Sequence, residues 1–172
     1  CLKPFDFDDP HVFAMEPLPR GETITSGVIK APRGSPAMAY AWDVCRQKDR
    51  DQLRWGEVGP RLVGETVEHL SLHSFVRRSE TFCPISYDQW SSLVIEDSPA
   101  QFGENTYSVH LWNEMWRRSG KDKNACYPSE SVYERLKGRF LDEALVTPSQ
   151  DDASQDDASQ DDASQDDPSQ DD

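Results

Sequence analysis

This sequence lacks three features, and each absence argues against a class of function. No apolar run is long enough to cross a bilayer, so we expect no membrane span in this chain. No two of the four cysteines have C-x-x-C spacing, which argues against a zinc ribbon and favours reduced thiols without disulfides. No stripe of basic residues is present to neutralise phosphates, so we expect no nucleic-acid partner.

The C-terminal residues form a tandem repeat instead of a globular sequence. From Pro148 the chain reads PSQDD, then ASQDD three times, then PSQDD. These pentads hold ten aspartates and no cation, so the net charge of −14 falls to −4 when they are set aside. The repeat has nothing large and apolar to bury. We therefore predict a domain over residues 1–146 and a disordered acidic tail over residues 147–172.

Local signals predict a strand and then a helix in the first third of the chain. Residues 22–30 are rich in β-branched side chains, and Gly27 interrupts them, as glycines do where a backbone or ligand approaches closely. Ser35 and Pro36 are a helix N-cap and first position, and the helix should run to about Lys48. Its predicted core-facing residues are Met38, Ala41, Trp42 and Cys45.

The remaining elements complete an alternation of strands and helices. A second helix should begin near Pro60, with short extended pieces over residues 82–95 and a strand over residues 107–112. Ser131 and Glu134 form a capping box at the start of a last helix. The two helices should bury Leu62, Val63, Val67 and Leu70, and Val132, Tyr133, Leu136 and Phe140. This order indicates an α/β fold class.

Several residues could carry chemistry, and each has a plain structural alternative. His69 and His73 have helical chelate spacing, but they lack an HExxH glutamate and suit a solvated helix surface. Asp6 and Asp8 form a D-x-D that could grip a divalent cation, although acidic turns before a proline are common. His110 could hold a metal, stack on a nucleotide or fill the core.

The loop WGEVGP at residues 55–60 combines groups that suit ligand binding. Its two glycines would let the backbone approach a ligand, Trp55 could stack on a ring, and Glu57 could act as a polar contact or catalytic group. The alternative is a tight turn that begins the second helix. The residues alone do not decide between these interpretations.

Five ordered blocks resemble a known family, the α-1,4-galactosyltransferase-like sugar transferases that contain a D-x-D motif (glycosyltransferase family 32). The blocks are CLKPF at 1–5, ITSGVIKAPRGSP at 24–36, WGEVGPRLV at 55–63, TFCPISYDQW at 81–90 and SVHLWN at 108–113. Their order is more specific than any single block, and together they cover nearly all of residues 1–146.

The resemblance implies a GT-A-like fold, which is a Rossmann-related α/β/α sandwich. It also implies transfer of a sugar, with retention, from a nucleotide-sugar donor to a hydroxyl of a glycan or glycolipid acceptor. A divalent metal, usually Mn²⁺, would bridge the donor diphosphate. In the family's terms His110 is the expected metal ligand and Glu57 the expected catalytic residue. The expected donor-binding residues are Ser26, Gly27, Trp55, Gly59, Pro60, Trp112 and Asn113.

Departures from the family pattern shape the expected activity. Ser26 stands where the family often has asparagine, and Val58 stands where some relatives carry an amide. The family D-x-D precedes the block that CLKPF resembles, so the main metal carboxylates are expected upstream of Cys1, and Asp6 and Asp8 are out of register. We therefore expect the C-terminal portion of a transferase, with an incomplete N-terminal half and little or no activity. The alternative is a non-catalytic relic that binds carbohydrate or protein. The family implies cytoplasm for a bacterial source and the Golgi lumen for a eukaryotic one.

Overall fold

The computed structural model describes residues 1–98, 100 and 102–141. The predicted tail, residues 147–172, lies outside the described residues. The chain divides into a compact unit, Cys1–Arg139, and a second unit that begins at Phe140. The sheet and all the expected site residues lie in the first unit.

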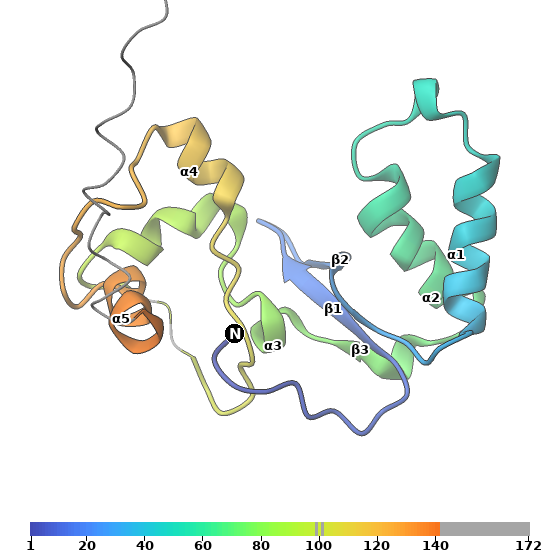
Figure 1. Cartoon of the computed structure of the whole chain (residues 1–172), viewed down its shortest axis with the longest axis horizontal. Coiled ribbons are helices and arrows are strands. Elements are labelled where there is room, and N and C mark those ends of the chain that lie inside the picture. The colour runs from blue at the N-terminus through green and yellow to red at the C-terminus, as the bar shows by residue number, and fades with distance from the viewer. Residues whose placement is uncertain (99, 101, 142–172) are drawn as a thin grey trace, which may run out of the picture. The chain divides into compact units, whose positions relative to one another are not determined.

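A small mixed sheet forms the centre of this unit (Figure 1). Strand β1 (Val12–Pro17) lies between β2 (Glu22–Lys30), which is antiparallel to it, and the short β3 (Val76–Arg77), which is parallel. The strand predicted over residues 22–30 is confirmed. The sequence did not predict β1, because its first residues are buried on both sides and show no alternation.

The pairing of β1 with β2 contains a wide irregularity. Phe13 lies opposite Ile29, but Met15 lies opposite Ile24, so residues 25–28 bulge out of the ladder. Gly27 is in this bulge, as is typical of a glycine inside a strand. Residues of this bulge line the cavity that is described below.

Helix α1 (Pro36–Gln47) begins where it was predicted, because the Ser35 hydroxyl accepts a hydrogen bond from the Ala37 N–H at 3.2 Å. Its predicted buried face was wrong for Met38 and Trp42, whereas Ala41 and Cys45 are half-buried. Ala37 is buried against Phe13, Val63 and Val67, whereas Met38 is 39% exposed and Trp42 is 64% exposed. The buried stripe is rotated by about one position, which periodicity alone cannot distinguish when small and large apolar residues alternate.

Helix α2 (Leu62–His69) follows a single π-turn, η2 (Glu57–Arg61), and lies beside α1 (Figure 1). Leu62, Val63 and Val67 are buried as predicted, and Leu70 is half-buried. Three short 3-10 segments accompany these elements: η1 (Arg50–Gln52), η3 (His73–Phe75) and η4 (Tyr87–Val94).

Two predicted extended regions are wrong. Helix α3 (Ser79–Phe82) and η4 occupy most of the stretch expected to be extended over residues 82–95. Residues 107–112 form no strand, although the backbone of Tyr107 hydrogen-bonds to Thr81 and Leu2 at 2.7 and 2.8 Å. An irregular segment that is half-buried shows the same alternation as a strand, which explains the error.

A cluster of buried apolar side chains packs around Trp116. Helix α4 (Asn113–Ser119) carries Trp116, which is 1% exposed and packs against η4 and α5 (Val132–Phe140). The capping box predicted for α5 is half right: the Ser131 hydroxyl accepts a hydrogen bond from the Glu134 N–H at 3.3 Å. The Glu134 carboxylate turns instead to the N–H of Tyr127 at 2.9 Å.

The described part of the unit is thus a mixed α/β structure with one three-stranded sheet. Among residues 1–98, 100 and 102–141, no helix has the length and apolar character needed to cross a bilayer.

Candidate functional site

A cavity of about 360 Å³ opens beside the bulge of β2. Two residues singled out from the sequence, Gly27 and His110, line it together, although 82 residues separate them along the chain. Three polar residues that the sequence did not single out, Glu16, Thr25 and Ser108, line it as well. The other lining residues are Cys1, Phe5, Ala14, Val28, Phe82, Cys83 and Val109.

His110 lies on the surface at the edge of this cavity. The residue is exposed, so the interpretation of a histidine that fills the core is wrong. Its ring lies over that of Trp112, with centroids 4.0 Å apart and an interplanar angle of 34°. Shielding from water lowers the pKa of His110 below its usual 6.5, and the negative charge of Glu16 partly opposes this effect. The imidazole is therefore neutral at pH 7 and can accept a hydrogen bond or bind a cation.

Trp112 fixes the position of the imidazole. Its indole N–H donates a hydrogen bond to the Ile85 carbonyl at 2.8 Å, and its backbone adopts a left-handed conformation with φ of 50°. Such a conformation is uncommon for a residue with a side chain. Here it lets the chain turn from the irregular segment directly into α4.

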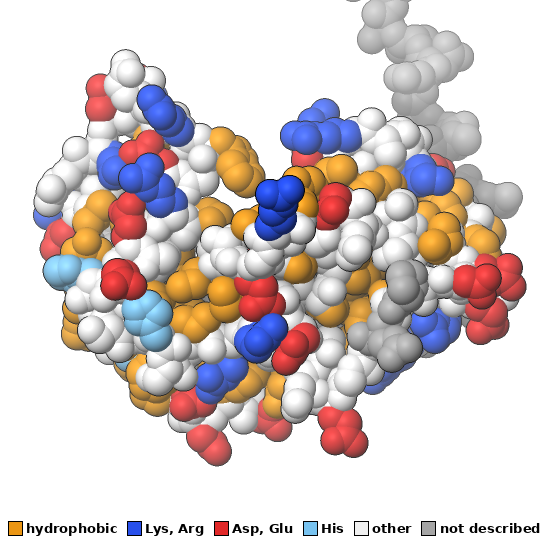
Figure 2. Space-filling model, turned by 180° about the vertical axis from the view of Figure 1, so that it is seen from behind, with side chains coloured by type: hydrophobic (Ala, Val, Ile, Leu, Met, Phe, Trp, Pro, Cys, Tyr) orange, Lys and Arg blue, Asp and Glu red, His pale blue; other side chains and the backbone are white. Residues whose placement is uncertain are grey.

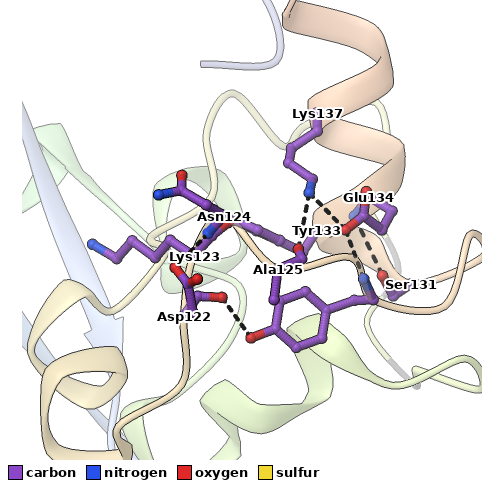
Figure 3. A network of polar contacts seen from close by, with 9 residues as sticks. Asp122, Lys123, Asn124, Ala125, Ser131, Tyr133, Glu134 and Lys137 are labelled. Carbon is purple, nitrogen blue, oxygen red and sulfur yellow. Dashed lines mark hydrogen bonds and ion pairs between the residues drawn. The ribbon is translucent and has the colours of Figure 1, made fainter. Parts of the chain in front are cut away.

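Asn113 is not among the residues lining the cavity. It is the first residue of α4 and exposed, and its side-chain oxygen accepts a hydrogen bond from the Lys123 ammonium. The loop that carries Lys123 is tied to α5 by the network in Figure 3, in which the Lys137 ammonium contacts Glu134 at 2.7 Å and the Ala125 carbonyl at 3.3 Å. Asn113 thus belongs to a structural network in this conformation.

The predicted loop of residues 55–60 lies beside β2, through the segment η2. A Cβ atom added to Gly59 would lie 3.5 Å from the Ser26 hydroxyl, an ordinary van der Waals distance, so Gly59 is next to the bulge and a larger residue would also fit there. Ser26 and Pro60, like Gly59, are outside the lining of the cavity. Trp55 is 97% exposed and is free to stack on a ligand.

Glu57 holds the loop together in this structure. Its carboxylate forms an ion pair with Lys48 at 2.7 Å and accepts a hydrogen bond from the Arg54 N–H at 3.1 Å. The Lys48 hydrogen bond, and after it the Arg54 N–H, hold the pKa of Glu57 below its usual 4.5. Both carboxylate oxygens are thus engaged, as expected for the alternative interpretation of a turn before the second helix.

We predict that Glu57→Gln lowers the urea midpoint of unfolding modestly, because the Lys48 ammonium loses its partner. Lys48→Met should have a similar effect, and the double variant should lose less than the sum of the two. Glu65→Gln is the matched control, since its pair with Arg61 at 2.8 Å is exposed and should contribute little. A catalytic Glu57 without this structural role would instead change turnover and leave the midpoint where it was.

The weaker metal motifs do not assemble into a site. The His69 ring stacks on Tyr40 at 4.2 Å, while His73 turns to Glu68 at 3.0 Å, as expected for a solvated helix surface. In the part of the chain that the structure describes, no group of three or more His, Cys, Asp or Glu side chains could hold a metal ion. The D-x-D of Asp6 and Asp8 therefore forms no complete site with its surroundings.

The surface charge is mixed. On the face seen in Figure 2, Lys and Arg side chains are scattered among acidic and uncharged ones. The expectation that nucleic acid is not a partner stays a prediction.

Sequence reasoning missed Glu16 and Thr25 as cavity residues. Glu16 lies on β1, the strand that the sequence did not predict, and Thr25 lies in the bulge next to Ser26. Glu16 belongs to none of the five blocks, and Thr25 lies in the block at 24–36 without having been singled out there. Recognition of β1 as a buried strand would have placed Glu16 beside residues 22–30, because the two strands pair.

The comparisons with known proteins give one match. A family model described as the alpha 1,4-glycosyltransferase conserved region matches residues 49–140, more than half of the chain. A search of curated proteins and a search of solved structures found no match. The matched region contains the 55–60 loop and His110, and the family indicates glycosyl transfer in general, with a sugar donor and an acceptor as substrates. The chain therefore belongs to the alpha 1,4-glycosyltransferase family.

Proposed function

We propose that this chain takes part in glycosyl transfer with retention and that the cavity beside β2 receives the sugar of a nucleotide-sugar donor. The observation that carries the proposal is the convergence of Gly27 and His110, from two separate family-like blocks, on one cavity. The acceptor would be a hydroxyl of a glycan or glycolipid. The proposed fold is GT-A-like, and the three-stranded sheet would be part of its central sheet.

The residues at the cavity suit binding and positioning. The neutral imidazole of His110 can face a phosphate or a hydroxyl, and Gly27 lets a ligand approach the backbone of the bulge. Trp55 and the neighbouring loop, which contacts Ser26 through Gly59, would lie toward the acceptor. Glu57 could act on a substrate only after leaving Lys48.

The proposed divalent metal, Mn²⁺ in the family, needs ligands beyond the described residues. Carboxylate oxygens suit Mn²⁺, whereas this cavity offers one imidazole and one carboxylate. This set does not form a metal site, in agreement with the lack of any suitable group of three among the described side chains. His110 would be one ligand of the ion, and carboxylates from outside the described residues would complete the set.

A non-catalytic module is the second candidate function. The engagement of Glu57 with Lys48 favours it, as does the incomplete metal set. Such a module would bind carbohydrate at the same cavity without transferring it. Binding and turnover must therefore be measured separately.

We predict that His110→Ala weakens binding of nucleotide sugars by about tenfold or more, as expected for the loss of one hydrogen bond to a charged group. Titration with a panel of UDP- and GDP-sugars, with and without Mn²⁺, measures this effect. His73→Ala is the matched control, since that exposed imidazole pairs with Glu68 away from the cavity. Product formation by this chain should be very low, because the described residues do not complete a metal site, and robust turnover would contradict this expectation. Equal binding by wild type and His110→Ala would remove His110 from the site.

A further inference from the structure

One carboxylate in the cavity has no partner. Glu16 is half-buried on β1 and lies opposite Thr23 of β2. Its carboxylate forms no hydrogen bond or ion pair with any other residue that the structure describes, although the residue lines the cavity with Gly27 and His110. The carboxylate oxygens of this half-buried residue still reach solvent, so a ligand that enters the cavity can replace their water with donors of its own.

Other acidic side chains with comparable shielding are satisfied. Glu22 accepts hydrogen bonds from Ser79, Glu57 from Lys48 and Arg54, and Glu134 from Tyr127 and Lys137. Each of these carboxylates stabilises a turn or a helix end. The Glu16 carboxylate stabilises neither a turn nor a helix end. It is therefore available to a ligand in the cavity.

The surroundings of Glu16 narrow the chemistry of the ligand. Phe5, Phe82, Val28 and Val109 give the cavity a mostly apolar and partly aromatic lining. A pyranose ring matches this arrangement, because its C–H faces pack on apolar walls while adjacent hydroxyls donate to a carboxylate. At about 360 Å³ the cavity lies near the small end of ligand pockets, roughly 300–1,000 Å³, so it suits one sugar ring and not a whole nucleotide sugar.

We propose that Glu16 determines which sugar the cavity accepts. Its carboxylate takes hydrogen bonds from ring hydroxyls, and its negative charge rejects rings that carry a carboxylate of their own. The inference rests on the proposed function, since it assigns a role within the same cavity. It adds a specificity-determining residue that lies outside the segment matched by the family.

The charge of Glu16 acts across the cavity. Burial, which is the larger cause, and the charge of Glu16 together raise the pKa of Cys83 to about 12. This charge also raises the pKa of His110 against the effect of shielding. A second negative charge placed in the same space would be repelled by the same charge.

Two matched ligand pairs test the proposal: UDP-glucose with UDP-glucuronate, and UDP-galactose with UDP-galacturonate. Within each pair only the C6 group changes, from an alcohol to a carboxylate. For the wild-type chain we expect about tenfold or greater preference for the neutral sugar of at least one pair, measured by calorimetric titration. Glu16→Gln should weaken binding of that neutral sugar by about 10- to 100-fold, the range for a hydrogen bond to a charged group. The same substitution should also reduce the preference for the neutral sugar over the uronate of that pair.

The control variant is Glu80→Gln, which removes one negative charge from an exposed position beside Arg78. It should bind like wild type. Glu16→Gln should keep its unfolding midpoint, because no described contact depends on the charge; a midpoint near that of wild type shows that a change in binding is not a folding defect. Equal affinity within both pairs, unchanged in Glu16→Gln, overturns the role of Glu16 and leaves the cavity as the sugar site. Failure of all four ligands to bind overturns the proposed function, and this inference with it.

Discussion

Trp116→Ala is expected to cost about 3–5 kcal/mol of unfolding free energy, the largest stability loss we predict for this chain. The side chain is 1% exposed and lies at the centre of the core formed by η4, α4 and α5. Its ring contacts three other aromatic rings, those of Trp90, Tyr127 and Tyr133, at centroid distances of 4.7–5.7 Å. Its indole N–H also donates to the Leu111 carbonyl at 2.7 Å, an acceptor that alanine would leave without this donor.

Small domains have about 5–15 kcal/mol of total stability, so this loss is a large fraction of it and should lower the unfolding midpoint clearly. Urea unfolding followed by far-UV circular dichroism measures it. Trp55→Ala is the matched control, because that side chain is 97% exposed and its removal should stay within about 0.5 kcal/mol. A Trp116→Ala midpoint close to that of wild type would mean that the core around α4 is not packed as described.

Sequence reasoning succeeded where the signal was local. The Ser35 cap, the start of α5 at Ser131 and the β-branched run of β2 each depend on neighbours in the chain, and all three are found. Reasoning failed where tertiary packing decides. Strand β1 is hidden because burial on both sides removes alternation, and residues 107–112 alternate without entering a sheet.

For the candidate site too, the sequence predicted some features and missed those that depend on tertiary packing. Gly27 and His110 share a cavity, and only the order of the family-like blocks could connect them in advance. Glu16 was out of reach because it lies on the strand that was not predicted. The engagement of Glu57 with Lys48, nine residues earlier, was equally hidden. It depends on a turn in which Gly56 has a left-handed φ of 78°, a backbone state that periodicity does not report.

Trp112→Ala is expected to weaken nucleotide-sugar binding at least as much as His110→Ala and to destabilise the fold as well. The indole lies beside the His110 ring, so its loss would release the imidazole from its orientation. The Ile85 carbonyl would lose its 2.8 Å hydrogen bond, and η4 its edge contact with the indole through Tyr87. We expect about 2 kcal/mol or more of lost stability from these changes together. Urea unfolding and ligand titration on the same samples measure the two effects.

Two further variants at this position separate the contributions of the aromatic ring, the indole N–H and the backbone conformation. Trp112→Phe keeps an aromatic ring beside His110 but lacks the N–H, so it should retain more of the binding than of the stability. Trp112→Gly removes the side chain but suits the φ of 50°, which costs a residue with a Cβ about 1–2 kcal/mol. Glycine is normally less stabilising than alanine by about 0.5–1 kcal/mol, so a glycine variant at least as stable as Trp112→Ala would reveal the backbone strain. If alanine were clearly the more stable of the two, the left-handed turn into α4 would be wrong, and with it the way the chain presents His110 to the cavity.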